Sequence, residues 1–117
     1  MAAITPVIDD TNSFSDTTTT YLWETLTESD TGTSQRINPA RTVLMSFSVV
    51  GTFGSATVVL QGSHDNTNWF TVKDNTGADI SFTSDGASEA ASTFVYFRPS
   101  ASGGSSQDVD CRLTVKV

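Results

Sequence analysis

Two residues of this 117-residue chain are candidates for nucleophilic or acid–base chemistry: His64 and Cys111, its single histidine and single cysteine. Acid–base catalysis by an imidazole needs a second positioned group, and a reactive thiol needs a nearby cation and some exposure. His64 lies among turn-forming residues, whereas Cys111 lies on the apolar side of an alternating stretch with Arg112 on the other side. We therefore expect Cys111 in the core, no catalytic residue, no cofactor and no enzymatic activity.

Oxygen-bearing side chains gather near two predicted turns, where they are Asp65, Asn66, Asn68, Asp74, Asn75 and Asp79. Calcium takes about six to eight oxygen ligands, and such turns can supply carboxylates and carbonyls together. The spacing fits no calcium-loop pattern, and Asp and Asn are common in turns because they bond to nearby backbone groups. The sequence predicts no metal site, with calcium binding at these turns as the alternative.

The elements that must position these side chains are strands. β-Branched and apolar residues predominate in 58–61 and 69–73, and a polar turn separates these two stretches. Trp69 opens the return strand, either as a plug of the core or as a stacking platform for a ligand. Asp74 to Gly77 predicts a second tight turn, which leads into 79–83. The region is therefore expected to be a series of antiparallel hairpins.

Alternation of apolar and polar residues predicts about seven or eight short strands and no helix, at 21–26, 41–50, 55–61, 69–73, 79–83, 93–98 and 109–117. In the first, Tyr21 and Trp23 are expected on one face, with Leu22 and Leu26 on the other. We expect a loop of small residues at 84–92 and a strand end at Pro99, followed by a flexible connection at 100–107. The pattern predicts an all-β fold, an antiparallel β-sandwich that is jelly-roll-like.

Residues 1–19 differ in composition from the rest and are predicted to be a flexible N-terminal arm, with 20–117 as a single domain. Pro6 and the Asp9-Asp10 pair discourage regular structure. The segment is either a frayed terminus or an arm that orders against a neighbouring protein. In the second case its apolar residues are the contact candidates: Ile4, Val7, Ile8 and Phe14.

Three aromatic residues are candidates for contacts between subunits. Phe94 and Tyr96 lie in a stretch that is apolar on both faces, and Phe53 lies between glycines in a predicted turn. A strand that is covered on both sides within one sandwich would explain Phe94 and Tyr96 equally well.

A formal net charge of −7 and only six scattered lysines and arginines disfavour binding to nucleic acid or to an anionic membrane surface. A single cysteine allows no internal disulfide, and no apolar run is long enough to span a bilayer. We also see no secretory leader pattern, and we expect synthesis in the cytoplasm of a host cell.

Three motifs together carry a resemblance to a known family: Gly62-Ser63-x-Asp65-x-x-x-Trp69 after an apolar strand, Tyr96-Phe97-Arg98-Pro99, and the alternating last strand. As a set, over roughly residues 41–117, they resemble small virion proteins of tailed phages, especially capsid decoration or cement proteins. The resemblance implies a virion structural protein that binds the outer surface of a bacteriophage capsid. Its partners would be the major capsid protein and itself, as a homotrimer at threefold positions.

Two alternatives stay open. A similar hairpin occurs in discoidin-like carbohydrate- and lipid-binding domains, although this chain is short and has no counterpart to their N-terminal loop-and-tryptophan region. That resemblance would imply a glycan-binding module or host-surface adhesin, with a ligand site at His64, Asp65, Asn66, Asn68 and Trp69. The other alternative is a tail, neck or head-fibre subunit of the virion.

Overall fold

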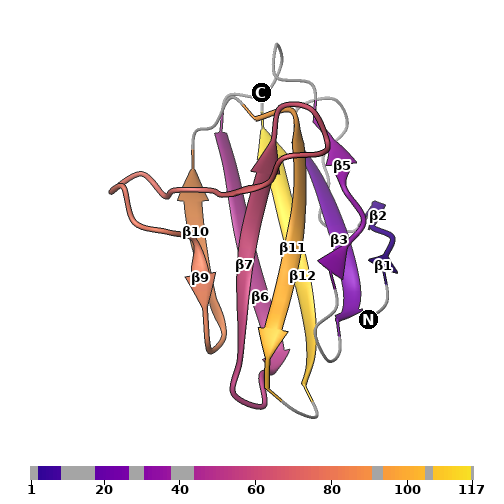
Figure 1. Ribbon diagram of the computed structural model, residues 1–117, viewed down its shortest axis with the longest axis vertical. Coiled ribbons are helices and arrows are strands. Elements are labelled where there is room, and N and C mark those ends of the chain that lie inside the picture. Colours follow the sequence, from indigo (N-terminus) through magenta and orange to yellow (C-terminus); the bar gives the residue numbers. More distant parts are fainter. Residues whose placement is uncertain are drawn as a thin grey trace.

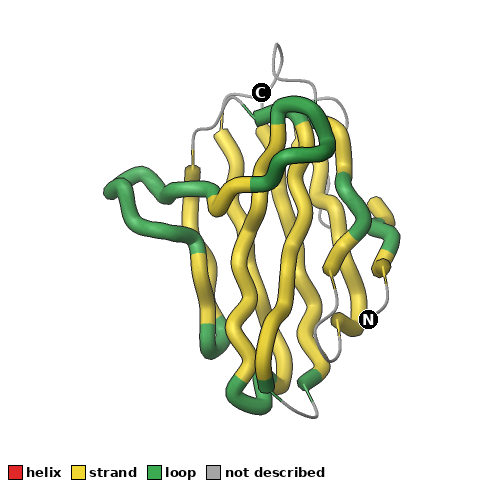
Figure 2. The backbone as a smooth tube through the Cα atoms, in the orientation of Figure 1, coloured by secondary structure: helices red, strands yellow, loops and turns green. Residues whose placement is uncertain are grey.

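The computed structural model describes residues 3–8, 18–26, 31–37, 44–90, 94–104 and 107–116. Within these ranges the chain forms strands and turns and no helix (Figure 2). The strands lie in two sheets that pack face to face (Figure 1). No helix in the described ranges is long and apolar enough to cross a membrane.

The first sheet is built around one long antiparallel pair, β7 (Ala56–Ser63) and β11 (Tyr96–Gly103). Its register runs from Tyr96 opposite Ser63 to Gly103 opposite Ala56. Short strands extend it on both sides: β1 (Ala3–Ile4), β4 (Thr31–Gly32), β5 (Gln35–Arg36), β8 (Phe70–Thr71) and β9 (Ser81–Phe82). The order is β1-β4-β11-β7-β8, with β5 also on β11 and β9 also on β7, and only the β1–β4 pair is parallel among these.

The second sheet is antiparallel throughout and has the order β10-β6-β12-β3-β2. Its strands are β2 (Val7–Ile8), β3 (Thr18–Leu26), β6 (Leu44–Thr52), β10 (Gly86–Ala90) and β12 (Asp108–Lys116). Among the described strands, consecutive ones lie in different sheets at seven places, which are β1/β2, β3/β4, β5/β6, β6/β7, β9/β10, β10/β11 and β11/β12. The prediction of a jelly-roll-like antiparallel sandwich is therefore confirmed.

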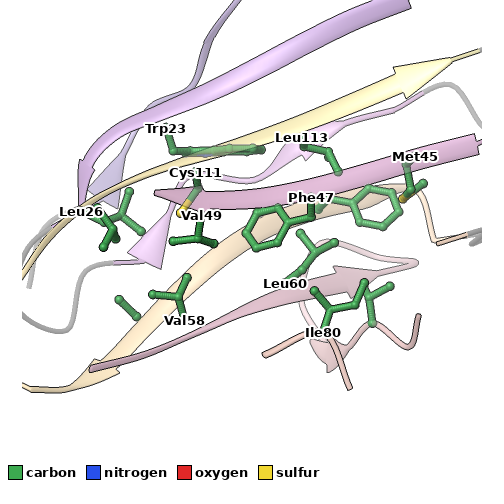
Figure 3. Close-up of a cluster of buried hydrophobic side chains, with 14 of the residues drawn as sticks. Trp23, Leu26, Met45, Phe47, Val49, Val58, Leu60, Ile80, Cys111 and Leu113 are labelled. Atoms are coloured by element: carbon green, nitrogen blue, oxygen red, sulfur yellow. The ribbon is translucent and has the colours of Figure 1, made fainter. Parts of the chain in front are cut away.

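The core lies between the sheets and follows the strand period of two, because alternate side chains point to opposite faces. Met45, Phe47 and Val49 of β6 are buried, while Ser46 and Ser48 between them are half-buried on the outer face. Figure 3 shows these side chains meeting others from β3, β7 and β12. The cluster includes Cys111, which confirms its predicted place in the core. Each fully buried large apolar side chain contributes about 1.5–3 kcal/mol through removal from water.

The predicted alternation of side chains between the two faces of β3 is confirmed only in part. Tyr21 and Trp23 share the inner face as predicted, but Leu26 is also fully buried there. The cause is a register shift: Trp23 lies opposite Cys111, while Leu26 lies opposite Val109. One extra residue in β3 forms a bulge, which resets the side-chain alternation. The indole Nε1 of Trp23 donates a hydrogen bond to the Thr33 carbonyl at 2.9 Å.

The predicted loop at 84–92 is wrong over Gly86–Ala90, which form β10 and pair with β6 from Val49 to Met45. This strand lies at the edge of its sheet, and Ala90 alone among its residues is buried. An edge strand that covers little core needs no large apolar side chains, so its sequence carries no alternating hydrophobic signal.

The strand end predicted at Pro99 is also wrong, because β11 continues to Gly103. Proline lacks the N–H that a ladder needs. On the β7 side Pro99 lies opposite Leu60. On the other side β5 pairs with Tyr96 and Phe97 and β4 with Ser100, so the ladder skips Arg98 and Pro99. Pro99 therefore lies where no backbone donor is required.

Candidate functional site

The turn between β7 and β8 is held together by one carboxylate. Oδ1 of Asp65 accepts hydrogen bonds from the backbone N–H groups of Thr67 and Asn68 at 2.9 and 2.8 Å, and from the Ser63 hydroxyl at 3.0 Å. Its Oδ2 accepts one from the Asn68 amide at 2.7 Å. Asn66 adopts a φ of 62°, a conformation that Asn tolerates well. The structure confirms the predicted turn and gives it a defined shape.

These hydrogen bonds, led by the one from the Asn68 backbone, hold the pKa of Asp65 far below its usual range. The second turn repeats the arrangement: Asp74 accepts from the Thr76 hydroxyl and from the N–H groups of Thr76 and Ala78, and its pKa is lowered. Both carboxylates serve the backbone of their own turns. No group of three or more metal-ligating side chains occurs among the described residues.

An aromatic cluster lies beside the first turn. The His64 ring lies 4.7 Å from the Phe94 ring, and Phe70 stacks on Phe94 at 6.3 Å with an interplanar angle of 13°. Phe94 also meets the buried Phe97 edge-on at 6.4 Å. Gly62 makes room for this cluster, since a Cβ there would lie 2.5 Å from Phe94 Cδ2. Phe70 remains 57% exposed, so the cluster ends in an accessible apolar ring.

Trp69 lies on the outer face of the first sheet and is half-buried, which makes it no core plug. The guanidinium carbon of Arg98 lies 4.1 Å from the centre of its ring. Arg98 Nε donates a hydrogen bond to Gln61 Oε1 at 2.8 Å. Arg98, Gln61 and Thr71 are directly opposite one another across β11, β7 and β8, so their side chains share one face. We call Trp69, Arg98, Gln61 and Thr71 the arginine site.

The turn candidates thus divide into separate environments. His64 packs in the aromatic cluster, Asp65 and Asn68 are hydrogen-bonded to each other, and Trp69 belongs to the arginine site. Sequence reasoning missed Arg98 and Gln61 as neighbours of Trp69. The strand period of two indicates which face of its own strand each side chain lies on, but local sequence does not show the register that brings the two strands together.

The three subunit-contact candidates also lie in different environments. Phe53 is 8% exposed and belongs to the core cluster, while Phe94 is half-buried beside His64. Tyr96 is half-buried on the outer face, opposite Ser63 and Arg36. Their role between subunits stays a prediction, and Tyr96 and Phe94 keep surface for it.

Two residues from the predicted arm form an exposed apolar pair. Val7 and Ile8 make β2 at the edge of the second sheet, beside β3, and are 52% and 53% exposed (Figure 1). Ile4 belongs to β1 in the other sheet, paired with β4. Phe14 lies outside the described residues. The arm therefore contributes a strand to each sheet and presents Val7 and Ile8 to solvent.

Cys111 is fully buried, and burial, with a smaller effect of Asp110, raises the pKa of its thiol to about 12. A thiol in that state is protonated and inert at neutral pH.

Comparison with models of known protein families finds no match, and comparison with curated proteins finds none either. Solved structures are similar in fold. YomS, a protein derived from the SPBc2 prophage, aligns with a TM-score of 0.67 over 91% of this chain and 100% of its own length, at 10% identity. The cupin domain of Cnp3 from Schizosaccharomyces pombe aligns at a TM-score of 0.48, with 11% identity, over 96% of this chain and 60% of that one.

Proposed function

We propose that this chain is a non-enzymatic structural protein of a phage particle, which binds the outer surface of the capsid as a homotrimer and stabilises the shell. The observation that carries the proposal is the similarity in fold to the prophage-derived YomS, which spans nearly all of one chain and all of the other. The hairpin motif at Gly62 to Trp69 supports it through its resemblance to capsid decoration proteins.

The exposed apolar pair Val7 and Ile8 suits contact with the major capsid protein. Large apolar side chains that are half exposed gain free energy when a partner covers them, at about 25 cal/mol per Å² of apolar surface. Among the described strands only β3 pairs with β2, and a partner strand could pair with the opposite backbone edge of β2. A short contact of this kind is weak alone.

A homotrimer would bind the capsid more tightly than this single contact does. Three copies placed on a threefold position of the shell engage three identical sites at once, which raises the overall affinity without any new contact. The net charge of −7 favours a protein partner over nucleic acid. The proposed location is the outer surface of the virion.

The test is co-sedimentation of the purified protein with capsid shells of the phage that encodes it. Wild-type protein should pellet with the shells. Replacing Val7 and Ile8 together with serine should weaken pelleting by at least about tenfold, the effect of losing roughly 1.4 kcal/mol. Val50→Ser is the matched control, because Val50 is 49% exposed on another strand of the same sheet.

The proposal is wrong if wild-type protein stays in the supernatant. Association with isolated tails or necks in place of shells would also overturn it, and would favour the tail or neck alternative. An equal loss of pelleting in the double variant and in Val50→Ser would exclude only the role of β2 and would leave capsid binding itself in place.

A further inference from the structure

Arg98 stands out because its partners are neutral in a strongly acidic protein. Within the described residues it contacts the Trp69 ring and Gln61, and no carboxylate pairs with it. By contrast, Lys73 on the neighbouring hairpin pairs with Asp79. Arg36 lies close by, because it is opposite Tyr96, two residues before Arg98 on the same face. The outer face of the first sheet thus has a locally cationic region in a chain of net charge −7.

The guanidinium is held in place from two directions. Gln61 accepts the hydrogen bond from Nε, and the guanidinium carbon lies over the Trp69 ring. The two terminal nitrogens make no hydrogen bond within the described part of the chain. They form the end of a rigid fork that matches a carboxylate through two parallel hydrogen bonds. Because the arginine is already ordered, binding would cost little side-chain entropy.

The neighbours of the fork suit a sugar ring. Trp69 and Tyr96 offer half-buried aromatic surface, which packs against the C–H faces of a pyranose. The amide nitrogen of Gln61 and the hydroxyl of Thr71, in the same row, can bond to ring hydroxyls. A bare acidic side chain from a protein partner would use the guanidinium and leave these groups without a function.

We propose that the arginine site binds a carboxylate-bearing sugar, with the carboxylate on the free edge of Arg98 and the sugar ring against the part of the Trp69 surface that Arg98 leaves uncovered. The inference goes beyond capsid binding and does not rest on it. It assigns the outer face of the first sheet to acidic glycans of the kind that carry uronic acid units.

The two tryptophans make a direct test possible. The indole N–H of Trp69 should shift in ¹H–¹⁵N NMR spectra as glucuronate is added, and that of Trp23, which is buried and bonded to Thr33, should not. Glucose and acetate are the comparison ligands. We expect glucuronate to bind at least about tenfold more tightly than either, because it alone engages both the fork and the ring.

Arg98→Gln should weaken glucuronate binding by at least about tenfold. Arg112→Gln is the matched control, since Arg112 lies on the other sheet, and it should bind as wild type does. An unchanged Trp23 signal verifies that each variant is folded. Three results would overturn the proposal: no shift of Trp69 at about 10 mM glucuronate, equal affinity for acetate or a glutamate-rich peptide, or full binding by Arg98→Gln. Because Arg98→Gln should still pellet with capsids, failure here leaves the capsid proposal intact.

Discussion

Replacing Gly32 with alanine should destabilise the protein, because no space exists for a methyl group there. An ideal Cβ would lie 2.5 and 2.7 Å from Cδ and Cγ of Pro99 and 2.7 Å from Cδ1 of Trp23. Carbon atoms normally pack at about 3.5–4.0 Å, so the overlap is roughly 1 Å on two sides. The proline ring is fixed within β11, and Trp23 is fully buried and hydrogen-bonded.

Overpacking of this kind costs about 1–3 kcal/mol, and the fixed neighbours place Gly32→Ala near the upper end. Loss of glycine entropy from the unfolded chain offsets about 0.4–1 kcal/mol. The net loss should be about 2 kcal/mol, which corresponds to a Tm decrease of roughly 8 °C for a domain of this size. Urea unfolding followed by tryptophan fluorescence measures it.

Gly103→Ala is the control, since nothing lies within 4 Å of its added Cβ and only the positive φ of 69° opposes it. It should cost about 1 kcal/mol. In a Pro99→Ala background the cost of Gly32→Ala should fall, because one of the two obstacles is removed. A Gly32→Ala protein as stable as wild type, or a cost unchanged by Pro99→Ala, would refute this packing.

Three further predictions concern the turn, the thiol and the core. Asp65→Asn should lower the Tm at pH 7. The folded-state pKa of Asp65 is depressed, so the stability that its carboxylate contributes is present above the unfolded pKa of about 4 and is lost as the pH falls through the lower folded pKa. The difference in Tm between wild type and Asp65→Asn should therefore shrink in acid. A difference that stays constant down to about pH 2 would contradict the depressed pKa of Asp65. Cys111 should resist a thiol reagent at pH 8 in the native protein and react after denaturation, whereas rapid native labelling would mean that it is exposed. Phe47→Ala, at a fully buried position, should cost about 3–5 kcal/mol in chemical denaturation, and a cost below about 1 kcal/mol would place Phe47 outside the core.

Much of the sandwich could be predicted because its core strands alternate cleanly. Val109, Cys111 and Leu113 read inward in the sequence and are fully buried in the structure. The turn at Asp65 was likewise visible, since short polar side chains satisfy their own backbone. Such a turn depends on neighbouring residues alone, so it can be predicted without knowing which distant strands pair.

The sequence-based predictions were wrong where the structure depends on pairing between strands that are distant in the sequence. Leu26 joins the core because a bulge forms against β12, and Pro99 is tolerated because β4 and β5 leave a gap beside it. The arginine site has the same origin. Gln61 and Arg98 are 37 residues apart, and only the β7–β11 register brings their side chains together.

Electron cryo-microscopy of capsids with and without the protein tests its proposed role most directly. Decoration predicts additional density of the size of three sandwiches on the outer surface at threefold positions, with β2 facing the shell. Shells that are identical in both samples, or density confined to the tail or neck, would contradict it.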